Sequence, residues 1–435
     1  MRSTKYAVVT ALAAAVSLAL AGCGSSSSSG ASPAAGSGGG KTLVVWDYEA
    51  NDNAAGIARA EAIKEFQAAH PGVTVKFEAK SFDQIQQNAG MILNSNDVPD
   101  VMEYNKGNST AGMLSKQGLL TDLTSQATAR GWDKTLSSSL QTTAKYTNGV
   151  MGGSAWYGVP MNGEFLTVYY NKDLFAKYNI AVPTTFDQFT AAMATFKNAG
   201  VTPLGMSGAD YLGVHLFYEL ALSKADRNWV DDYQLFKDKV DFKGPQLSYA
   251  ANTFADWVSK GYISKDSAAV KAQDEANAFE QGKIPMFFSG NWWYGSFLTE
   301  IKNMQWGTFL FPGNTLQVGS SGNLWVVPTK SKNKDLAYDF INTTLSKPVQ
   351  NLMGNSGGIP VAADPAAITD PRSKDLIDEF DSITSHDGLA FYPDWPVTGY
   401  YDTLQHAVQE LINGSKSPSS MLDSIGAVYK QNAPQ

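Results

Sequence analysis

Two clusters of aromatic and acidic residues carry side chains well suited to holding a ligand. Trp46, Asp47 and Glu49 stand at the end of a β-branched run, and Phe391-Tyr-Pro-Asp-Trp395 forms an aromatic stretch without helical or strand periodicity. An aromatic ring covers the apolar face of a ligand, whereas a carboxylate accepts hydrogen bonds from its hydroxyl groups. The clusters therefore predict a site for a ligand with an apolar face and a polar rim. The expected contacts are Trp46, Asp47, Glu49, Asp394 and Trp395.

The motifs of common catalytic and metal sites are absent from the sequence. Its four histidines, at positions 70, 215, 386 and 406, show no metal-ligand spacing, and there is no Gly-x-Ser-x-Gly motif. Gly38-Gly-Gly-Lys-Thr42 is similar to the end of a phosphate-binding loop, but position 35 is Ala where that motif has Gly. We therefore expect no enzyme, no cofactor and no metal. A cell-surface glycosidase, which needs only two carboxylates, stays as the enzymatic alternative.

Composition excludes several classes of protein. The 435 residues include 33 Lys and Arg against 41 Asp and Glu, a net charge of −8, so there is no basic surplus for a nucleic acid. Aromatic residues make up 11% and charged residues 17%, which fits a globular protein and not a disordered chain. Because the sequence has one cysteine, an intramolecular disulfide is excluded.

The N-terminus has the pattern of an export signal. Arg2 and Lys5 precede an apolar run from Tyr6 to Leu20, and Leu20-Ala-Gly-Cys23 follows at once. This last pattern resembles the bacterial lipobox, in which the cysteine receives a lipid. We predict a lipoprotein signal peptide over 1–22, lipidation at Cys23 and a Ser/Gly-rich tether over 23–40. The expected location is extracytoplasmic, with a lipid anchor in the outer face of the bacterial cytoplasmic membrane.

The elements that position the first cluster alternate between strands and helices. Apolar spacing predicts strands at 41–46, 73–78 and 98–104 and helices at 54–69 and 82–93. This order is typical of parallel βαβ units, whose ligands bind beyond the carboxyl ends of the strands. Tyr104 and Asn105 follow the third strand as Asp47 follows the first, so both are candidates. The residues expected to bury one face of the first helix are Ile57, Ala60, Ile63, Lys64 and Phe66.

The remainder of the chain reads as mixed α/β, mostly helical. Strands are predicted at 165–170, 284–289, 306–310 and 324–327, and helices at 173–178, from 183 and at 402–413. Asp210 lies in a loop comparable to those after the early strands, and Trp325 lies in a short strand. Both are further candidates for ligand contact.

Five short motif blocks occur in order along the chain. They are Val98-Pro-Asp-Val101 with Leu119-Leu-Thr-Asp-Leu123; Tyr157-Gly-Val-Pro160 with Tyr170-Asn-Lys-Asp-Leu-Phe175 and Pro183-Thr-Thr-Phe186; Phe279-Glu-Gln-Gly-Lys-Ile-Pro-Met286; Gly290-Asn-Trp292; and Gly357-Gly-Ile-Pro-Val361. Behind a lipobox and a tether, this series resembles the extracellular solute-binding proteins of carbohydrate ABC importers, the group that includes the maltose-binding protein. The resemblance covers essentially the whole mature chain.

The resemblance implies a two-lobed, periplasmic-binding-protein-like α/β fold of type II, with hinge crossovers and a ligand cleft between the lobes. The boundaries expected on this basis are 41–162 for the N-terminal lobe, 163–312 for the C-terminal lobe, 313–356 for a return to the N-terminal lobe, and 357–435 for C-terminal helices packing on the C-terminal lobe.

The resemblance also implies four site residues. Glu164 has the spacing of a sugar-binding glutamate, and Trp292 matches the family's Gly-x-Trp aromatic plate. Trp293 is its neighbour and should point elsewhere if the pair is extended. Tyr401 falls where the maltose-binding protein has a stacking tryptophan, so the aromatic ring at this position is smaller.

The implied function is that of a substrate-binding subunit. It captures a mono- or oligosaccharide outside the membrane and delivers it to the permease subunits of an ABC importer. The same scaffold binding a polyamine, a peptide or an organic acid is the alternative. The arginines after the leader are Arg59, Arg130, Arg227 and Arg372, none in a candidate loop, which argues against an anionic ligand.

Overall fold

The computed structural model describes residues 41–434. The predicted signal peptide 1–22, the lipidation site Cys23 and the tether 23–40 lie outside the described residues. Within residues 41–434, every helix is too short or too polar to cross a membrane.

Strands and helices alternate at the start of the described chain, as the sequence predicts. The elements are β1 (Lys41–Asp47), α1 (Ala54–Ala69), β2 (Val73–Ala79), α2 (Phe82–Asn94) and β3 (Val101–Tyr104). β1 pairs in parallel with both β2 and β3. The Asn53 side chain accepts a hydrogen bond from the Gly56 amide at 2.8 Å and so caps α1. The predicted βαβ arrangement is confirmed, although β3 begins at Val101 and not at residue 98.

Helix α1 buries a different face from the one that its apolar spacing predicts. Its buried residues are Ala54, Gly56, Ala58, Arg59, Ala62 and Phe66, whereas Ala60 and Lys64 are exposed. Small residues on the buried face let α1 pack closely on α14 (Lys334–Thr344) and α15 (Lys347–Asn355). Arg59 is turned inwards because it pairs with the buried Asp47. The prediction is therefore wrong for Ala60 and Lys64, whereas Phe66 is buried and Ile57 and Ile63 are half-buried. A spacing rule does not foresee a buried ion pair.

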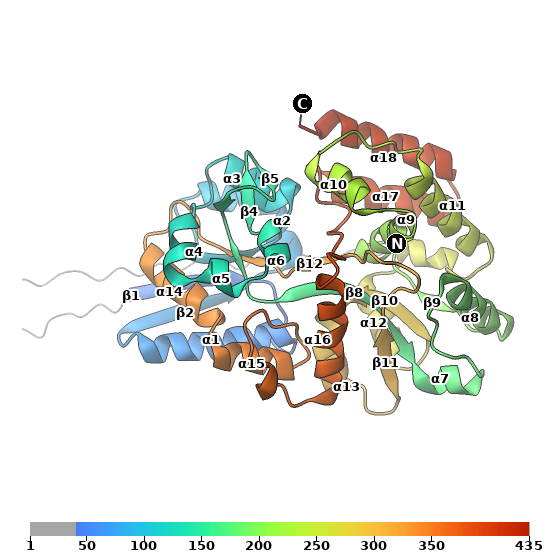
Figure 1. Cartoon of the computed structure of the whole chain (residues 1–435), viewed down its shortest axis with the longest axis horizontal. Coiled ribbons are helices and arrows are strands. Elements are labelled where there is room, and N and C mark those ends of the chain that lie inside the picture. The colour runs from blue at the N-terminus through green and yellow to red at the C-terminus, as the bar shows by residue number, and fades with distance from the viewer. Residues whose placement is uncertain (1–40, 435) are drawn as a thin grey trace, which may run out of the picture. The chain divides into compact units, whose positions relative to one another are not determined.

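The first sheet is completed by strands from far along the chain. Its order is β2-β1-β3-β13-β7, with β7 at Val159–Pro160 and β13 at Leu324–Val326. β13 runs antiparallel to both of its neighbours. This sheet and the helices packed on it, coloured blue, teal and orange in Figure 1, are called the first lobe below.

Short elements fill the chain between β3 and β7. They are a π-helical turn (Asn108–Gly112), α3 (Met113–Lys116), α4 (Thr124–Arg130), α5 (Trp132–Thr135), α6 (Ser138–Thr142), β4 (Lys145–Thr147), β5 (Val150–Met151) and β6 (Ala155–Trp156). The last three form a small antiparallel sheet. The Tyr146 hydroxyl in this sheet accepts a hydrogen bond from the Gly107 amide at 3.0 Å, which fixes the loop after β3.

The second sheet is built around one long buried strand, β8 (Gly163–Asn171). Its order is β11-β8-β10-β9, with β9 at Leu204–Gly205, β10 at Met286–Gly290 and β11 at Trp306–Phe309. The start of β8 pairs separately with β12 (Gly319–Ser321). Because β7 leads into β8 and β12 leads into β13, two crossovers between the sheets lie side by side at this point.

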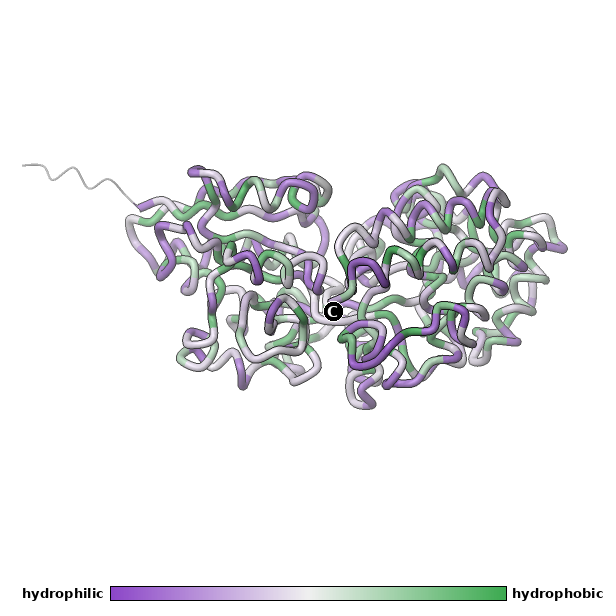
Figure 2. Tube along the Cα trace, turned by 90° about the horizontal axis from the view of Figure 1, so that it is seen from above, coloured by the Kyte–Doolittle hydropathy of each residue, from purple (hydrophilic) through white to green (hydrophobic). Residues whose placement is uncertain are grey.

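Helices and short turns surround the second sheet and make up the second lobe with it. They are α7 (Lys172–Lys177), α8 (Phe186–Asn198), α9 (Tyr211–Leu222), α10 (Arg227–Leu235), α11 (Pro245–Ser259), η2 (Lys265–Ala269), α12 (Ala272–Glu280), η3 (Asn291–Trp293), α13 (Tyr294–Glu300), η4 (Pro365–Ala367), α16 (Pro371–Thr384), α17 (Tyr400–Asn413) and α18 (Pro418–Asn432). The last two helices pack with α9 and α11 on one side of the lobe (Figure 1). Most helices carry both hydrophilic and hydrophobic residues along their length (Figure 2), as amphipathic packing requires.

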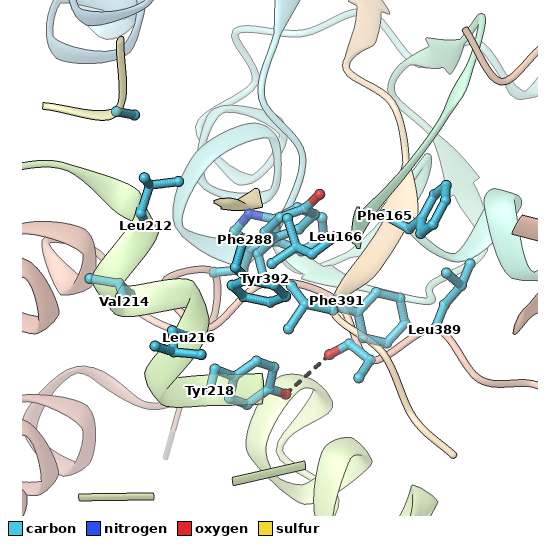
Figure 3. Packing of buried hydrophobic residues seen from close by; sticks show 14 of the residues in the cluster. Phe165, Leu166, Leu212, Val214, Leu216, Tyr218, Phe288, Leu389, Phe391 and Tyr392 are labelled. Atoms are coloured by element: carbon cyan, nitrogen blue, oxygen red, sulfur yellow. Dashed lines mark hydrogen bonds between the residues drawn. The ribbon is translucent and has the colours of Figure 1, made fainter. Parts of the chain in front are cut away.

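The core of the second lobe fixes the predicted aromatic loop. Phe391 and Tyr392 lie among buried side chains of α9, β8 and β10 (Figure 3). The Tyr218 hydroxyl on α9 donates a 3.0 Å hydrogen bond to the main-chain oxygen of Ala390 (Figure 3). The loop is therefore held from two sides, by ring packing and by its main chain.

Candidate ligand-binding site

Asp47 ends β1 in a buried ion pair with Arg59 of α1. The Nη1 atom of Arg59 lies 2.9 Å from Oδ1 and 2.7 Å from Oδ2 of Asp47. Burial raises the pKa of Asp47 to about 6, and the Arg59 charge opposes that rise. The predicted contact Asp47 is thus bound to Arg59 and fixes the loop that follows β1.

Side-chain amides hold Glu49 in that loop. Asn53 donates to Oε2 of Glu49 at 2.6 Å, and Asn323 donates to Oε1 at 3.4 Å. Asn323 lies between β12 and β13, so Glu49 links the loop after β1 to a crossover between the sheets.

Tyr48 and Glu103 form a second buried polar group beside this loop. Oε2 of Glu103 accepts the Tyr48 amide at 3.2 Å. Burial first, and then the charges of Glu49 and Asp47, raise the pKa of Glu103 well above its usual range. The buried Tyr48 hydroxyl has no hydrogen-bond partner in the described part of the chain.

A buried ion pair joins the loop after β3 to strand β8. Nζ of Lys106 lies 2.5 Å from Oε2 of Glu164 and 3.0 Å from Oδ1 of Asn323. The same ammonium stands 5.6 Å from the ring centroids of Tyr392 and Trp395. Burial raises the pKa of Glu164, and the Lys106 charge opposes that rise. Lys106 thus connects the first lobe, a crossover strand and the aromatic loop.

The aromatic loop also packs directly on the first lobe. The Ser109 amide donates to the main-chain oxygen of Trp395 at 2.9 Å, and Nδ2 of Asn108 donates to the main-chain oxygen of Gln234 at 2.7 Å. Gly107 has a φ of +110°, and a Cβ there would lie 2.6 Å from the Trp395 ring. Only glycine allows this approach, which brings the two lobes into contact on this side.

Trp292 marks the second lobe's part of the site. It lies in the turn after β10, and its Nε1 donates to the Tyr211 hydroxyl at 3.3 Å. The His215 ring stands 6.3 Å from Trp292, at an interplanar angle of 71°. It also stands 5.1 Å from the Tyr392 ring. These four rings, contributed by α9, the turn after β10 and the aromatic loop, form an aromatic wall.

A small cavity lies between the two lobes next to this wall. It encloses about 20 Å³, which is close to the space of one water molecule. Its lining comes from both lobes and consists of Glu49, Asn53, Ala54, Ala55, Asn162, Glu164, Asn291, Trp292, Met353, Gly357 and Gly358. Carboxylates, side-chain amides and one indole ring are the groups that bind polyhydroxylated ligands.

The family model for bacterial extracellular solute-binding proteins matches residues 49–351. The chain belongs to this family. The "Multiple sugar-binding protein" of Streptococcus mutans is 24% identical to this solute-binding protein, over 69% of this chain and 70% of its own. The "Diacetylchitobiose binding protein DasA" of Streptomyces coelicolor is 25% identical, over 74% of this chain and 73% of its own.

A solved structure shows the same fold. It comes from work on xylan utilization by Caldanaerobius polysaccharolyticus and matches with a TM-score of 0.77 at 22% identity, covering 89% of this chain and 99% of its own. The solute-binding protein therefore has the two-domain mixed α/β fold of such proteins, and the fold class predicted from the sequence is confirmed.

Three of the sequence-predicted residues line the cavity together, namely Glu49, Glu164 and Trp292. Trp395 and Asp394 lie in the neighbouring aromatic loop, where burial raises the pKa of Asp394 to about 6. Tyr401 is half-buried in the first turn of α17.

The other predicted residues of this solute-binding protein serve its framework. Lys80 covers the Trp46 ring at 4.2 Å, Tyr104 is buried in β3, and Asn105 accepts the Lys106 amide. Asp210 accepts hydrogen bonds from the Ser207 hydroxyl and the Ala272 amide. Trp325 packs on Phe340 in the core of the first lobe.

The position of Trp293 shows why the sequence could not tell which of Trp292 and Trp293 faces the cavity. Asn291–Trp293 is a 3-10 turn and not an extended segment. Trp293 stacks on Phe297 at 6.2 Å and donates to the Ser289 hydroxyl at 3.0 Å, so its ring belongs to the second-lobe core.

Sequence reasoning missed Tyr48, Lys106, Tyr211, His215, Asn323 and Tyr392. Lys106 directly follows a predicted residue, and Tyr48 and Tyr392 stand inside the two predicted clusters. A wider window around the predicted residues would have included these three, and also Tyr211, which directly follows Asp210. His215 had no such signal, because a single histidine in an apolar helix is more often a core residue.

Two other features of the described residues bear on alternative sites. Within residues 41–434, no group of three His, Cys, Asp or Glu side chains is placed to hold a metal ion. A larger pocket of about 310 Å³ lies on the first lobe, away from the crossovers, between Trp132, Ser346 and Arg130. Its polar groups are paired with one another, Ser346 with Glu65 at 2.8 Å and Trp132 with Asn342 at 3.1 Å.

Proposed function

We propose that this solute-binding protein captures a mono- or oligosaccharide outside the cytoplasmic membrane and passes it to the permease subunits of an ABC importer. The observation that carries the proposal is the cavity between the lobes, where Trp292 meets Glu49, Glu164 and several side-chain amides. An indole ring matches the C–H face of a pyranose, and carboxylates and amides match its hydroxyl rim. The sugar-binding relatives in the same family support this reading.

The lobes have to separate before a sugar can enter. A cavity of about 20 Å³ does not admit a pyranose ring. We assign the hinge to the paired crossovers β7–β8 and β12–β13. The first crossover lies at the predicted boundary between 41–162 and 163–312. Residues 313–321, expected in the return 313–356 to the first lobe, instead precede the second crossover, because β12 pairs with β8. Ligand then shifts the population between open and closed forms.

A direct binding experiment tests the function. The mature protein is titrated calorimetrically with glucose, galactose, xylobiose, cellobiose, maltose and N,N′-diacetylchitobiose, and with putrescine and glutamate as non-sugar controls. We expect saturable binding of at least one sugar with the sugar intact afterwards by chromatography. Binding of a control alone would contradict the proposal, and cleavage of the sugar would favour the glycosidase alternative.

Trp292 supplies the first mutational prediction. Replacing it with alanine (Trp292→Ala) should weaken sugar binding by about 10- to 100-fold, because a stacked aromatic contributes ~1–3 kcal/mol. Trp293→Ala is the matched control, and it should lower the melting temperature instead, since that ring packs in the core. Calorimetric titration and a melting curve on both variants distinguish a ring that binds the ligand from a ring that packs in the core. Unchanged affinity in Trp292→Ala would place the sugar elsewhere.

The lipid anchor gives the second prediction. Cys23 is the one thiol of the chain and stands at the predicted lipobox. We expect Cys23→Ser to leave the precursor uncut or to release the protein from membranes, measured by detergent partitioning of whole cells. Full membrane retention of the variant would contradict lipidation at this residue.

A further inference from the structure

Two buried polar groups beside Trp292 have no hydrogen-bond partner in the described chain. They are Nδ1 of His215, on α9, and the hydroxyl of Tyr392, in the aromatic loop. His215 is 6% exposed and Tyr392 5% exposed. Buried polar groups in folded proteins are almost always hydrogen-bonded, because losing water without a partner is unfavourable. Two such groups on neighbouring rings therefore point to a partner that the protein itself does not provide.

The two groups belong to the site described above. Their ring centroids lie 5.1 Å apart, and His215 stands 6.3 Å from Trp292, which lines the cavity. The charge of the cavity residue Glu164 acts on the Tyr392 hydroxyl, and that of Lys106 acts on the His215 ring. A ligand held on Trp292 thus lies within reach of both.

The charged groups around the cavity, in contrast, already have partners. Glu164 is paired with Lys106, Asp47 with Arg59, and Glu49 accepts hydrogen bonds from two amides. A ligand ammonium needs an unpaired carboxylate, and a ligand carboxylate needs an unpaired cation.

The two partnerless groups are themselves neutral. Burial, assisted by the Lys106 charge, lowers the pKa of His215 to about 3, and burial raises the pKa of Tyr392. Both side chains are therefore uncharged across the physiological pH range.

We propose that His215 and Tyr392 hydrogen-bond hydroxyl groups of the ligand beside Trp292, and that the site selects an uncharged sugar over an amino sugar or a uronic acid with the same ring. The inference rests on the proposed function, since it assigns further residues and a ligand class to the same site. Selectivity follows because the carboxylates of the site are already paired or hydrogen-bonded and His215 and Tyr392 are neutral, so a ligand charge meets no unengaged counter-charge.

Two conservative variants test the residue assignment. Tyr392→Phe removes one hydroxyl and keeps the ring that packs on Trp395, and His215→Phe keeps an aromatic ring on α9. Each should weaken binding of the tightest sugar in the panel above by about 2- to 10-fold. The melting temperature of ligand-free Tyr392→Phe should not fall, because the deleted hydroxyl has no partner to lose. A purely structural role of that hydroxyl predicts the reverse, a lower melting temperature with unchanged affinity.

Tyr400→Phe is the matched control. It also deletes a buried hydroxyl, but that hydroxyl interacts with Tyr233 and its ring packs on Tyr429, in the helical layer of the second lobe. Its sugar affinity should equal that of the wild type.

Matched ligands test the selectivity. Glucose is compared with glucosamine and glucuronate, and cellobiose with the corresponding β-1,4-linked glucosamine dimer, by calorimetric titration at pH 7. The neutral member of the set that binds should bind at least tenfold more tightly than its charged counterparts. Tighter binding of a charged member would overturn the selectivity.

The outcomes separate the inference from the function on which it rests. A wild-type protein that binds sugar, with unchanged affinity in both Tyr392→Phe and His215→Phe, would overturn the residue assignment and leave the proposed function standing. A wild-type protein that binds no sugar of the panel would overturn the function, and the inference with it.

Discussion

Replacing Lys106 with methionine should lower the free energy of unfolding by about 3–5 kcal/mol. Lys106 is 2% exposed and Glu164 8% exposed, and their charged atoms lie 2.5 Å apart. Removing the ammonium leaves the Glu164 carboxylate buried without a compensating charge, which is far more costly than losing a surface ion pair. Urea denaturation of Lys106→Met and wild type, followed by circular dichroism, measures the difference.

The double variant Lys106→Met/Glu164→Gln is the control for that result. It removes both charges, so it should recover a large part of the stability lost in the single variant. The defect of Lys106→Met should also shrink at pH 5, since a carboxyl that has lost its cation is relieved by taking up a proton. A single variant as stable as the wild type would mean that water reaches Glu164 in solution.

Stability should fall as pH rises from 5 to 8, and Glu219 should account for much of that fall. Glu219 is fully buried on α9, where its carboxyl accepts hydrogen bonds from Asn314 at 2.7 Å and from the Val318 amide at 3.0 Å. Burial raises its pKa from the usual 4.5 to about 8. Between these two values the folded protein holds a proton that the unfolded chain has released, so raising the pH favours unfolding. The expected loss is on the order of 4 kcal/mol over three pH units.

Glu219→Gln tests this directly, because glutamine has nearly the same shape and no charge. Denaturation curves at pH 5, 6, 7 and 8 should show a much flatter profile than the wild type, and the variant should be the more stable of the two at pH 8. Burial also raises the pKa of Glu379 to about 7, which contributes in the same direction, so some slope should remain. An unchanged slope in Glu219→Gln would show that Glu219 does not carry the effect.

The sequence alone predicted the local structure well where a single rule decides it. The helix Ala54–Ala69 was predicted with its bounds from its apolar spacing and from His70-Pro-Gly72, which ends it. Glu164 and Trp292 were placed in the site by short motifs, and the structure brings both to one cavity. Such features depend on neighbours in the chain or on a fixed spacing, so they can be read without a fold.

Other features depend on partners that are distant in the chain. Arg59 is buried because it forms an ion pair with the buried Asp47. Lys106, in the loop after β3, pairs with Glu164 on β8. Among the tryptophans, a 3-10 turn sends Trp292 to the cavity and Trp293 to the core, although the two are adjacent. The spacing of hydrophobic residues predicts which side of a helix or strand is buried, but not which residues pack against that side.

The sequence by itself determined the βαβ start, the two-lobed α/β fold, the family and the richness in aromatic and acidic residues that suits a sugar. The tertiary structure decided which of these residues act together, since it assigned Trp325 and Trp293 to cores and His215 and Tyr392 to the wall beside Trp292. The physical reason is that the binding groups come from both sheets, their crossovers and the C-terminal loop. Only the packed chain shows which charges neutralise one another and which polar atoms are left for a ligand.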